Sequence, residues 1–323
     1  MKAVVIYQKG DLPQYTEDFP DPVARDENET VISVKAAAIK HLDRSRSSGK
    51  HYTARGDLSS AKIIGGDGVG ILPDGTRVFA LGNGMLAEKA VVEKDRIIKV
   101  PKGLDDATAA ALPNAVAGSA MALRFRARMK KGETVFINGA TGFTGKIAVQ
   151  VARYYGAQKI IATGRNEETL QALRTLGADE IISLKQDDES LVAQIKRIHR
   201  ATPIDIIIDY LWGHTAELIL SSLAGQGGYT HRTRFVSIGS VTGDKIQLSA
   251  EILRSVDLQL SGSGLGSWTR NELKELFRVI VPKMFRLAAS RQLKADIRTI
   301  ELADIEKLWD MDMPDGVRLV ATL

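Results

Sequence analysis

The sequence predicts a two-domain α/β protein, in which a β-rich region precedes a doubly wound parallel sheet with helices on both faces. Three observations support this prediction. The 323 residues exceed what one hydrophobic core usually serves. Apolar runs separated by turns fill residues 1–117, whereas from Glu133 onward such runs alternate with amphipathic helical stretches. A glycine-rich turn at 139–145 joins the first strand to the first helix of this second region.

The first region reads as a series of strands. Turn signals separate the apolar runs, among them Pro-Asp-Gly at 73–75 and Gly-Asn-Gly at 82–84. An alanine-rich passage at 104–129 follows and predicts a helix, a break near Pro113 and a second helix. The strands are predicted at 3–7, 30–39, 76–81 and 89–100.

The second region alternates strands with helices. Several of the helical stretches end in glycine, as helix C-termini often do. Six strands with helices between them make a complete dinucleotide-binding fold, which we assign to residues 118–262. Two more helices and a last strand at 317–323 follow. The six strands are predicted at 134–138, 159–163, 180–183, 204–209, 234–239 and 258–262, and the helices at 146–156, 167–177, 189–200 and 215–225.

The composition is that of an ordinary globular protein, 44% hydrophobic and 26% charged. No apolar run approaches the roughly 18 residues that span a bilayer, and the N-terminus reads as a strand rather than a signal peptide. The absence of cysteine excludes disulfides and cysteine zinc sites and fits a reducing cytoplasm. Basic residues give a net charge of +5 but are scattered, so we expect neither a nucleic acid nor a membrane as partner.

The glycine-rich turn predicts a phosphate site. The pattern G-x-G-x-x-G is met at Gly142 and Gly145, with Ala140 in its first position. Gly142 would let the backbone approach a pyrophosphate, and Gly145 would let the helix pack closely on the sheet. The helix N-terminus would offer N–H groups to the anion, whereas the alternative is a tight structural turn. The candidate binding residues are Ala140, Thr141, Gly142, Phe143, Thr144, Gly145 and Lys146.

The end of the second strand indicates which dinucleotide binds. An NAD site usually has an acidic residue about 20 residues after the turn, where this chain has Gly164, Arg165 and Asn166. Gly164 leaves space, and Arg165 offers a permanently charged fork to a 2′-phosphate. The two glutamates that follow are better placed to stabilise the next helix. Lys146 could add charge or simply be solvated, and the sequence predicts NADP(H) rather than NAD(H).

Two later segments end strands of the same sheet and are candidates to hold the nicotinamide. Ligands bind at the carboxyl ends of strands in open α/β sheets, and the glycines there would let backbone amides approach. The alternative is an ordinary turn after each strand. The candidate residues are Ile238, Gly239, Ser240, Ser263, Gly264 and Leu265.

Four stretches in particular, in this order, carry a resemblance over nearly the whole chain: VKAAAIKHLDRSRSSGKHY (34–52), IIGGDGVGILPDGTRVFA (63–80), KKGETVFINGATGFTGKIAVQVAR (130–153) and LSGSGLGSW (260–268). The sequence resembles the medium-chain dehydrogenase/reductase superfamily, in its zinc-free quinone oxidoreductase branch. The resemblance implies a GroES-like catalytic domain made of residues 1–117 and 263–323. It also implies an inserted Rossmann domain, an active-site cleft at the junction of the two, and a homodimer.

The resemblance also implies that zinc is absent. The three positions that carry zinc ligands in the zinc alcohol dehydrogenases are Lys40, Gly66 and Asn114 in this chain. None of them supplies a thiolate or an imidazole, which zinc prefers. His41 and Asp67 remain nearby, but two residual ligands do not make a site.

Three residues are candidates for the catalytic groups that the resemblance implies. Tyr52 matches a tyrosine that lines the substrate site in many quinone reductases, or it packs as a loop aromatic. Lys40 could donate a proton, point to solvent, or pair with Asp43 or Asp67. Asn114 could hydrogen-bond the substrate or the nicotinamide.

The predicted function is NADPH-dependent, zinc-independent reduction of quinones or α,β-unsaturated carbonyls by hydride transfer. Such conjugated acceptors need only hydrogen-bond donors for the oxygen that gains charge. Two alternatives remain open: reduction of a ketone or aldehyde without a metal, and an NADPH-binding protein without catalysis.

Overall fold

The computed structural model describes residues 1–51, 54, 60–225, 230–309 and 315–323, which form two compact units. The first unit consists of residues 1–113 and 277–323, and the second of residues 114–276. The predicted Rossmann segment, 118–262, lies inside the second unit. No helix in the described ranges is long and apolar enough to cross a membrane.

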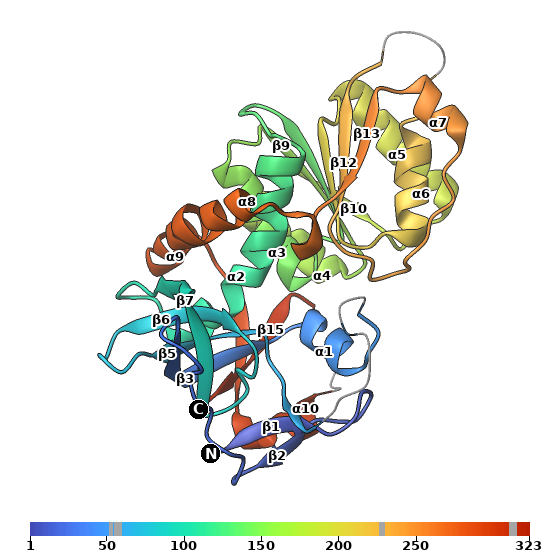
Figure 1. Cartoon of the computed structure of the whole chain (residues 1–323). Helices are drawn as coiled ribbons and strands as arrows, with labels where there is room; N and C mark the ends of the chain where they lie inside the picture. The colour runs from blue at the N-terminus through green and yellow to red at the C-terminus, as the bar shows by residue number, and fades with distance from the viewer. Residues whose placement is uncertain (52–53, 55–59, 226–229, 310–314) are drawn as a thin grey trace. The chain divides into compact units, whose positions relative to one another are not determined.

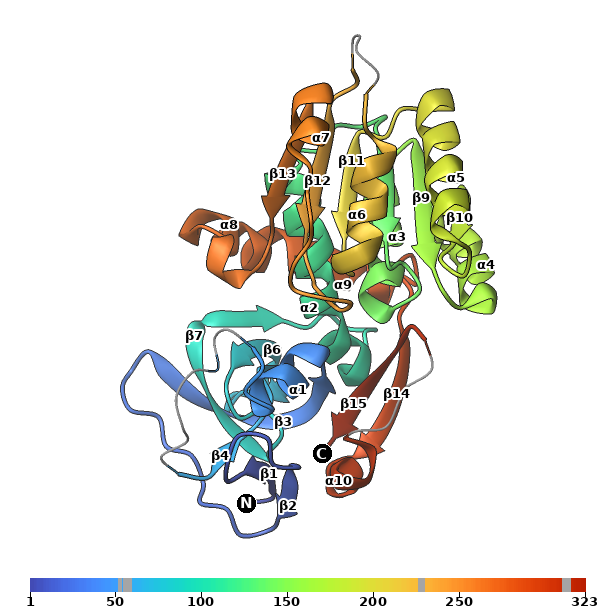
Figure 2. The same ribbon diagram turned by 90° about the vertical axis from the view of Figure 1, so that its right-hand side faces the viewer.

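The first unit is built on a six-stranded sheet with the order β14-β15-β3-β5-β6-β7. A further pairing of β3 with β7 curls this sheet into a barrel, and a second sheet has the order β2-β1-β4. Both chain termini belong to this unit, and Figure 2 shows β14 beside β15. Its strands are β1 (Ala3–Ile6), β2 (Gln14–Thr16), β3 (Glu29–Ile39), β4 (Lys62–Ile63), β5 (Asp67–Ile71), β6 (Arg77–Gly82), β7 (Lys89–Lys99), β14 (Asp296–Glu301) and β15 (Val317–Thr322).

Apolar side chains from β3, β6, β7 and β15 fill the barrel, and Trp309 joins them with 3% of its surface exposed.

The described part of the first unit has few helical elements. The helical elements are α1 (His41–Ser47), α9 (Val281–Ala289), η4 (Leu302–Asp304) and α10 (Ile305–Leu308). The chain leaves this unit within α2 (Asp106–Met121) and returns within η3 (Leu276–Ile280).

The second unit is a parallel sheet with the strand order β10-β9-β8-β11-β12-β13. Helices α5 and α6 cover one face and bury Phe136, Ile161 and Phe235, while α3 lies on the other face (Figure 1). The strands are β8 (Thr134–Asn138), β9 (Lys159–Gly164), β10 (Glu180–Ser183), β11 (Ile206–Asp209), β12 (Thr233–Ser237) and β13 (Leu258–Gly262). The helical elements are η1 (Ala122–Arg126), α3 (Phe143–Tyr154), α4 (Glu167–Leu176), α5 (Asp188–Ala201), α6 (Gly213–Ser222), α7 (Ala250–Ser255), η2 (Leu265–Ser267) and α8 (Arg270–Glu275).

The local sequence explains these elements. Strand β8 is buried at all five positions, as expected of a parallel strand covered on both faces. Helix α4 begins where the Asn166 side chain accepts the Thr169 N–H, and it ends at Gly177, whose φ of 115° is left-handed. Helix α5 is capped in the same way by Asp187. The expected fold class, a β-rich domain with a Rossmann domain, is confirmed.

Two sequence predictions about individual elements are wrong. The predicted break near Pro113 is absent, because α2 runs through this proline. Leu112 before Pro113 and Ala115 and Val116 after it are buried, and that packing outweighs the lost hydrogen bond. The C-terminal part holds a strand, β14, that the sequence analysis did not predict. Four of the six residues of β14 are exposed, so it lacks the apolar run of a buried strand.

Candidate functional site

The glycine-rich turn lies between β8 and α3 in the second unit, as a phosphate site of the Rossmann type requires. A Cβ on Gly145 would lie 2.5 Å from the Gly139 carbonyl oxygen and from Ala140 Cα, so only glycine permits this approach of helix and turn. Gly142 is exposed and has open space around it, and no side chain caps α3 there. The first turn of α3 therefore presents backbone N–H groups that a phosphate can accept.

The start of the turn is held by β9. The Gly139 N–H donates to the Thr163 hydroxyl at 3.1 Å, and the Ala140 N–H donates to the Thr163 carbonyl at 2.7 Å. These two amides already donate hydrogen bonds within the protein. The amides available to a ligand therefore begin at Thr141, one residue beyond the first fingerprint position.

Gly164, at the end of β9, has a different role from the one expected. A side chain there would collide with Thr141, which packs against the glycine. The space at Gly164 is thus filled by the turn rather than left open. Gly164 serves to bring β9 close to the turn, and the fingerprint depends on it as much as on Gly145.

Arg165 follows β9 and is exposed. Within the described ranges, the structure records no hydrogen bond or ion pair for its guanidinium. Asn166 is the N-cap of α4, and its side-chain oxygen accepts the Thr169 N–H at 2.9 Å. Lys146 lies partly buried in α3. Gly164 and Asn166 carry no charge, so Arg165 is the residue after Thr163 that presents a charge to solvent.

The segment after β12 uses its backbone differently from the prediction. The amides of Ile238 and Gly239 both donate to the Asp209 carbonyl, at 2.7 and 3.2 Å. A Cβ on Gly239 would lie 2.7 Å from the Tyr210 carbonyl oxygen, which explains the glycine by close packing. Ser240 is exposed and is the polar group of this segment that remains on the surface.

The segment after β13 combines a buried and an exposed part. The Ser263 N–H donates to the Ser237 carbonyl at 2.8 Å, and its hydroxyl accepts the Trp268 indole N–H at 3.0 Å. Gly264 has open space around it, and Leu265 is 44% exposed. The Gly264 N–H donates to the Ser267 hydroxyl at 3.0 Å, so this segment offers an exposed apolar side chain and free space beside Gly264 rather than a free amide.

Lys40, in the first unit, is the N-cap of α1 and is 2% exposed. Its ammonium lies 2.5 Å from Asp67 Oδ1 and 3.0 Å from Asp43 Oδ2, and it donates to the Ala38 carbonyl at 3.2 Å. Of the alternatives that the sequence left open, the structure shows the ion pairs. Three acceptors satisfy all three ammonium protons.

Arg318 of β15 adds a second, partly buried cation beside this cluster, and one of its N–H groups donates to the Ile39 carbonyl. Burial would lower the pKa of Lys40, but Asp43 and Asp67 outweigh burial and raise it. Burial lowers the pKa of Arg318 to about 10. Burial raises the pKa of Asp67; Lys40 opposes this shift, and Asp43 adds to it. Lys40 is thus a firmly protonated ammonium between two carboxylates.

These residues do not fit a zinc ion. The Lys40 ammonium already pairs with both Asp43 and Asp67, and it would repel a divalent cation placed beside them. A side chain at Gly66 would point toward Asp43, with its Cβ 3.4 Å from Oδ1, but glycine supplies no ligand. Lys40 therefore puts an ammonium at one of the three positions that carry a zinc ligand in the zinc alcohol dehydrogenases.

The other two catalytic candidates are less fully described. Asn114 is partly buried in α2, directly after Pro113, and belongs to the second unit. Tyr52 lies outside the described residues, so its predicted role stays a prediction.

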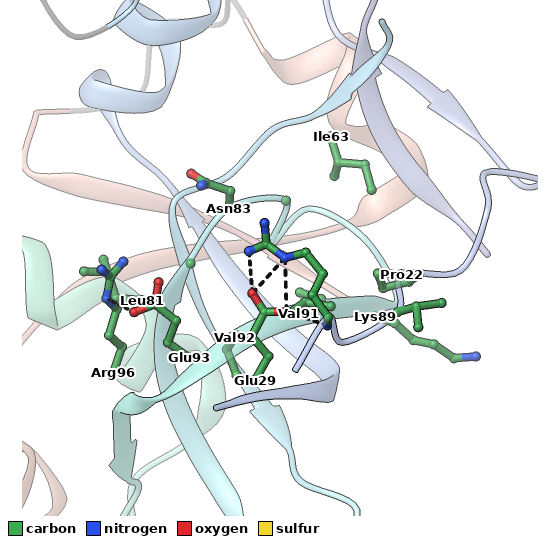
Figure 3. Close-up of a pocket in the computed structure, with 15 residues that line it drawn as sticks. Pro22, Glu29, Ile63, Leu81, Asn83, Lys89, Val91, Val92, Glu93 and Arg96 are labelled. Carbon is green, nitrogen blue, oxygen red and sulfur yellow. Dashed lines mark hydrogen bonds and ion pairs between the residues drawn. The ribbon is translucent and has the colours of Figure 1, made fainter. Parts of the chain in front are cut away.

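A separate pocket of about 280 Å³ lies in the first unit, lined largely by β6, β7 and the segment before β3 (Figure 3). Charged side chains on its wall are already paired, Arg25 with Glu29 and Arg96 with Glu93. None of the predicted site residues that the structure describes lines this pocket, and its paired charges leave little to bind a charged ligand.

Sequence reasoning missed four polar residues that shape these sites, three of them buried and one, Arg318, partly buried. Arg318 has no local signal, because its partners lie more than 200 residues away in the chain. The other three, Asn138, Thr163 and Asp209, stand at the carboxyl ends of neighbouring strands and are fully buried. A polar residue ending each of three apolar strands is a signal that could have been used.

Similar proteins were found at the level of sequence. A family profile for zinc-binding dehydrogenases matches residues 144–281. A probable NADPH-dependent quinone reductase of Emericella nidulans is 27% identical, with 98% of each chain covered. The quinone oxidoreductase of Sus scrofa is 28% identical over 85% of this chain and 84% of its own.

Solved structures agree with these relatives. The quinone oxidoreductase of Thermus thermophilus, described together with its NADPH complex, is 27% identical and superimposes with a TM-score of 0.80 over the whole of both chains. The quinone oxidoreductase of Escherichia coli, complexed with NADPH, gives the same TM-score at 23% identity and full coverage, a likeness of fold. The chain therefore belongs to the medium-chain dehydrogenase/reductase superfamily, in its quinone oxidoreductase-like branch.

Proposed function

We propose that this protein is an NADPH-dependent, zinc-independent oxidoreductase that reduces quinones or α,β-unsaturated carbonyls. The observation that carries the proposal is an exposed arginine, Arg165, at the end of β9 beside an uncapped helix N-terminus. The likeness to quinone reductases named for their use of NADPH supports the same cofactor.

The chain supplies a fitting place for each part of the dinucleotide. The first turn of α3 offers N–H groups to the pyrophosphate, and Arg165 offers a charge-assisted contact to the 2′-phosphate. Ser240 and the segment around Gly264 are proposed to hold the nicotinamide. When bound, NADPH supplies a hydride. The remaining residues have to place the acceptor and stabilise the oxygen that gains charge.

The absence of fitting zinc ligands favours conjugated acceptors. Reduction of a simple carbonyl develops charge on the oxygen at once, and a metal commonly stabilises that charge. A quinone or enone spreads the charge over a conjugated system, so neutral hydrogen-bond donors suffice. We propose Tyr52 and Asn114 as these donors. Lys40 holds its protons between carboxylates, and we assign it to fastening α1 rather than to proton donation.

Turnover over a panel of substrates tests the proposal. NADPH oxidation should be followed with quinones, enones, and simple ketones and aldehydes, and NADH should replace NADPH in a parallel series. We expect turnover with quinones or enones and a clear preference for NADPH. Turnover limited to ketones and aldehydes would identify a metal-free carbonyl reductase. Binding of NADPH without turnover of any class would identify a binding protein instead.

We further expect a cytoplasmic homodimer. The lack of cysteine supports the cytoplasm, and the resemblance to the family supports the dimer.

A further inference from the structure

A line of buried polar side chains crosses the carboxyl ends of three adjacent strands in the second unit. Thr163 of β9, Asn138 of β8 and Asp209 of β11 are each 0% exposed. The Thr163 hydroxyl donates to Asn138 Oδ1 at 2.8 Å, and the Asn138 amide donates to Asp209 Oδ1 at 2.8 Å. The sheet order β9-β8-β11 makes this line continuous.

Which group donates and which accepts in each hydrogen bond can be worked out along the line, starting from Asp209. Asp209 accepts the backbone N–H groups of Leu211 and Trp212 as well as the Asn138 amide, so it acts as an acceptor throughout, although burial raises its pKa. An acceptor at Asp209 turns the NH₂ group of Asn138 toward it, and Oδ1 therefore faces Thr163. The Thr163 hydroxyl must then donate to Asn138, which leaves its lone pair for the Gly139 N–H.

The line connects two loops that follow strands of the sheet. At one end, Thr163 holds the amides of Gly139 and Ala140 at the start of the glycine-rich turn. At the other end, Asp209 holds the amide of Trp212, whose φ of 60° is in the left-handed region that non-glycine residues rarely adopt. Such a backbone persists where its surroundings fix it.

From these contacts we propose that Asp209, Asn138 and Thr163 form a relay that positions the glycine-rich turn for nucleotide binding. The proposal rests on the proposed function, because it assumes that the turn holds the pyrophosphate. All three are positioning residues: the Thr163 hydroxyl and carbonyl accept N–H groups of the turn, and Asn138 and Asp209 act on the turn rather than on the nucleotide. Because the relay acts on the turn and not on the 2′-phosphate, its loss should weaken NADPH and NADH binding by the same factor.

Thr163→Val tests the relay, because valine keeps the shape and removes the hydroxyl. Thr233→Val is the matched control: Thr233 is also 0% exposed and donates one buried hydrogen bond, to the Ile204 carbonyl at 2.8 Å. Thr233 begins β12, so it lies at the amino ends of the strands, away from the carboxyl ends that carry the glycine-rich turn. Both variants should lose thermal stability, Thr163→Val more than Thr233→Val, because the Thr163 hydroxyl makes two hydrogen bonds and that of Thr233 one. Only Thr163→Val should raise the dissociation constants for NADPH and NADH, by roughly three- to tenfold.

Two further variants keep the test decisive. Thr163→Ser restores the hydroxyl and should bind both nucleotides as the wild type does. Asp209→Asn reaches the turn through Asn138 and through Leu211, whose side chain lies against Gly139. It should weaken both nucleotides in parallel, also where Thr163→Val fails to fold. Wild-type affinity in Thr163→Val or Asp209→Asn, or an equal loss of affinity in Thr233→Val, would overturn the relay. A wild-type protein that binds neither nucleotide would instead contradict the proposed function.

Discussion

Replacing Lys40 by methionine removes one charge from the interior of the first unit and keeps a side chain of similar length. The cluster around Lys40 pairs two cations, Lys40 and Arg318, with two carboxylates, Asp43 and Asp67. In Lys40→Met the two carboxylates face each other with only one cation. Breaking one side of a buried pair typically costs about 3–5 kcal/mol, and we expect a loss of folding free energy in this range at pH 8.

The cost should depend on pH. Without Lys40, the carboxyl of Asp67 loses the attraction that opposes burial, and its folded-state pKa rises further above the unfolded value of about 3.9. A carboxyl with a raised folded pKa binds its proton more tightly in the folded state. Stability therefore falls as the pH rises from the unfolded pKa to the folded pKa. Relative to the wild type, Lys40→Met should be less destabilised at pH 5 than at pH 8.

Urea unfolding at pH 5 and pH 8 measures this difference. Trp309 lies in the same unit and is buried, and replacing Trp212 and Trp268 by phenylalanine leaves it as the reporter. Lys40→Met/Asp67→Asn removes one charge of each sign and should recover most of the loss at pH 8. A loss below about 1 kcal/mol at both pH values, typical of an exposed pair, would refute the buried cluster.

Three further predictions concern the cofactor, the metal and the proton donor. Arg165→Ala should raise the dissociation constant for NADPH by about one to two decades, the worth of a charge-assisted contact, while NADH binding stays nearly unchanged; an equal loss for both nucleotides in direct titrations would refute the assignment. Turnover should survive exhaustive chelation, with far less than one zinc per chain by elemental analysis, whereas stoichiometric zinc with chelator-sensitive activity would contradict metal independence. Tyr52→Phe should lower kcat for enones by about 10²–10⁴-fold and for quinones by less, because the enolate of an enone must be protonated after hydride transfer, whereas a hydroquinone anion can take its proton from water; unchanged kcat on enones would exclude Tyr52 as the donor.

The strands and helices of the second unit could be predicted because their signals are local. Strand β8 was predicted at its observed bounds from an uninterrupted apolar run, and the glycine turn from its spacing. The start of α3 was placed three residues late, at Lys146 instead of Phe143, because Phe143-Thr144-Gly145 reads as a turn. A helix that begins inside a glycine motif is stabilised by packing on the sheet, which no local pattern reports.

The candidate sites could be predicted only in part, because their contacts are long-range. The sequence named Asp43 and Asp67 as possible partners of Lys40. It could not decide between pairing, exposure to solvent and proton donation, because Asp67 is 27 residues away on β5. It expected space at Gly164, which Thr141 fills. It expected the amides of Ile238 and Gly239 to serve a ligand, whereas Asp209 accepts both. In each case a neighbouring strand or turn decides what the residue does.

Direct titration of the wild-type protein with NADPH and with NADH tests the central claim, a dinucleotide site in the second unit that recognises the 2′-phosphate through Arg165. Both titrations can follow the fluorescence of the reduced nucleotide under the same buffer and salt, since salt screens an exposed arginine. We predict that NADPH binds more tightly than NADH by about one to two decades. Equal affinity for the two nucleotides, tighter binding of NADH, or binding of neither would contradict the account.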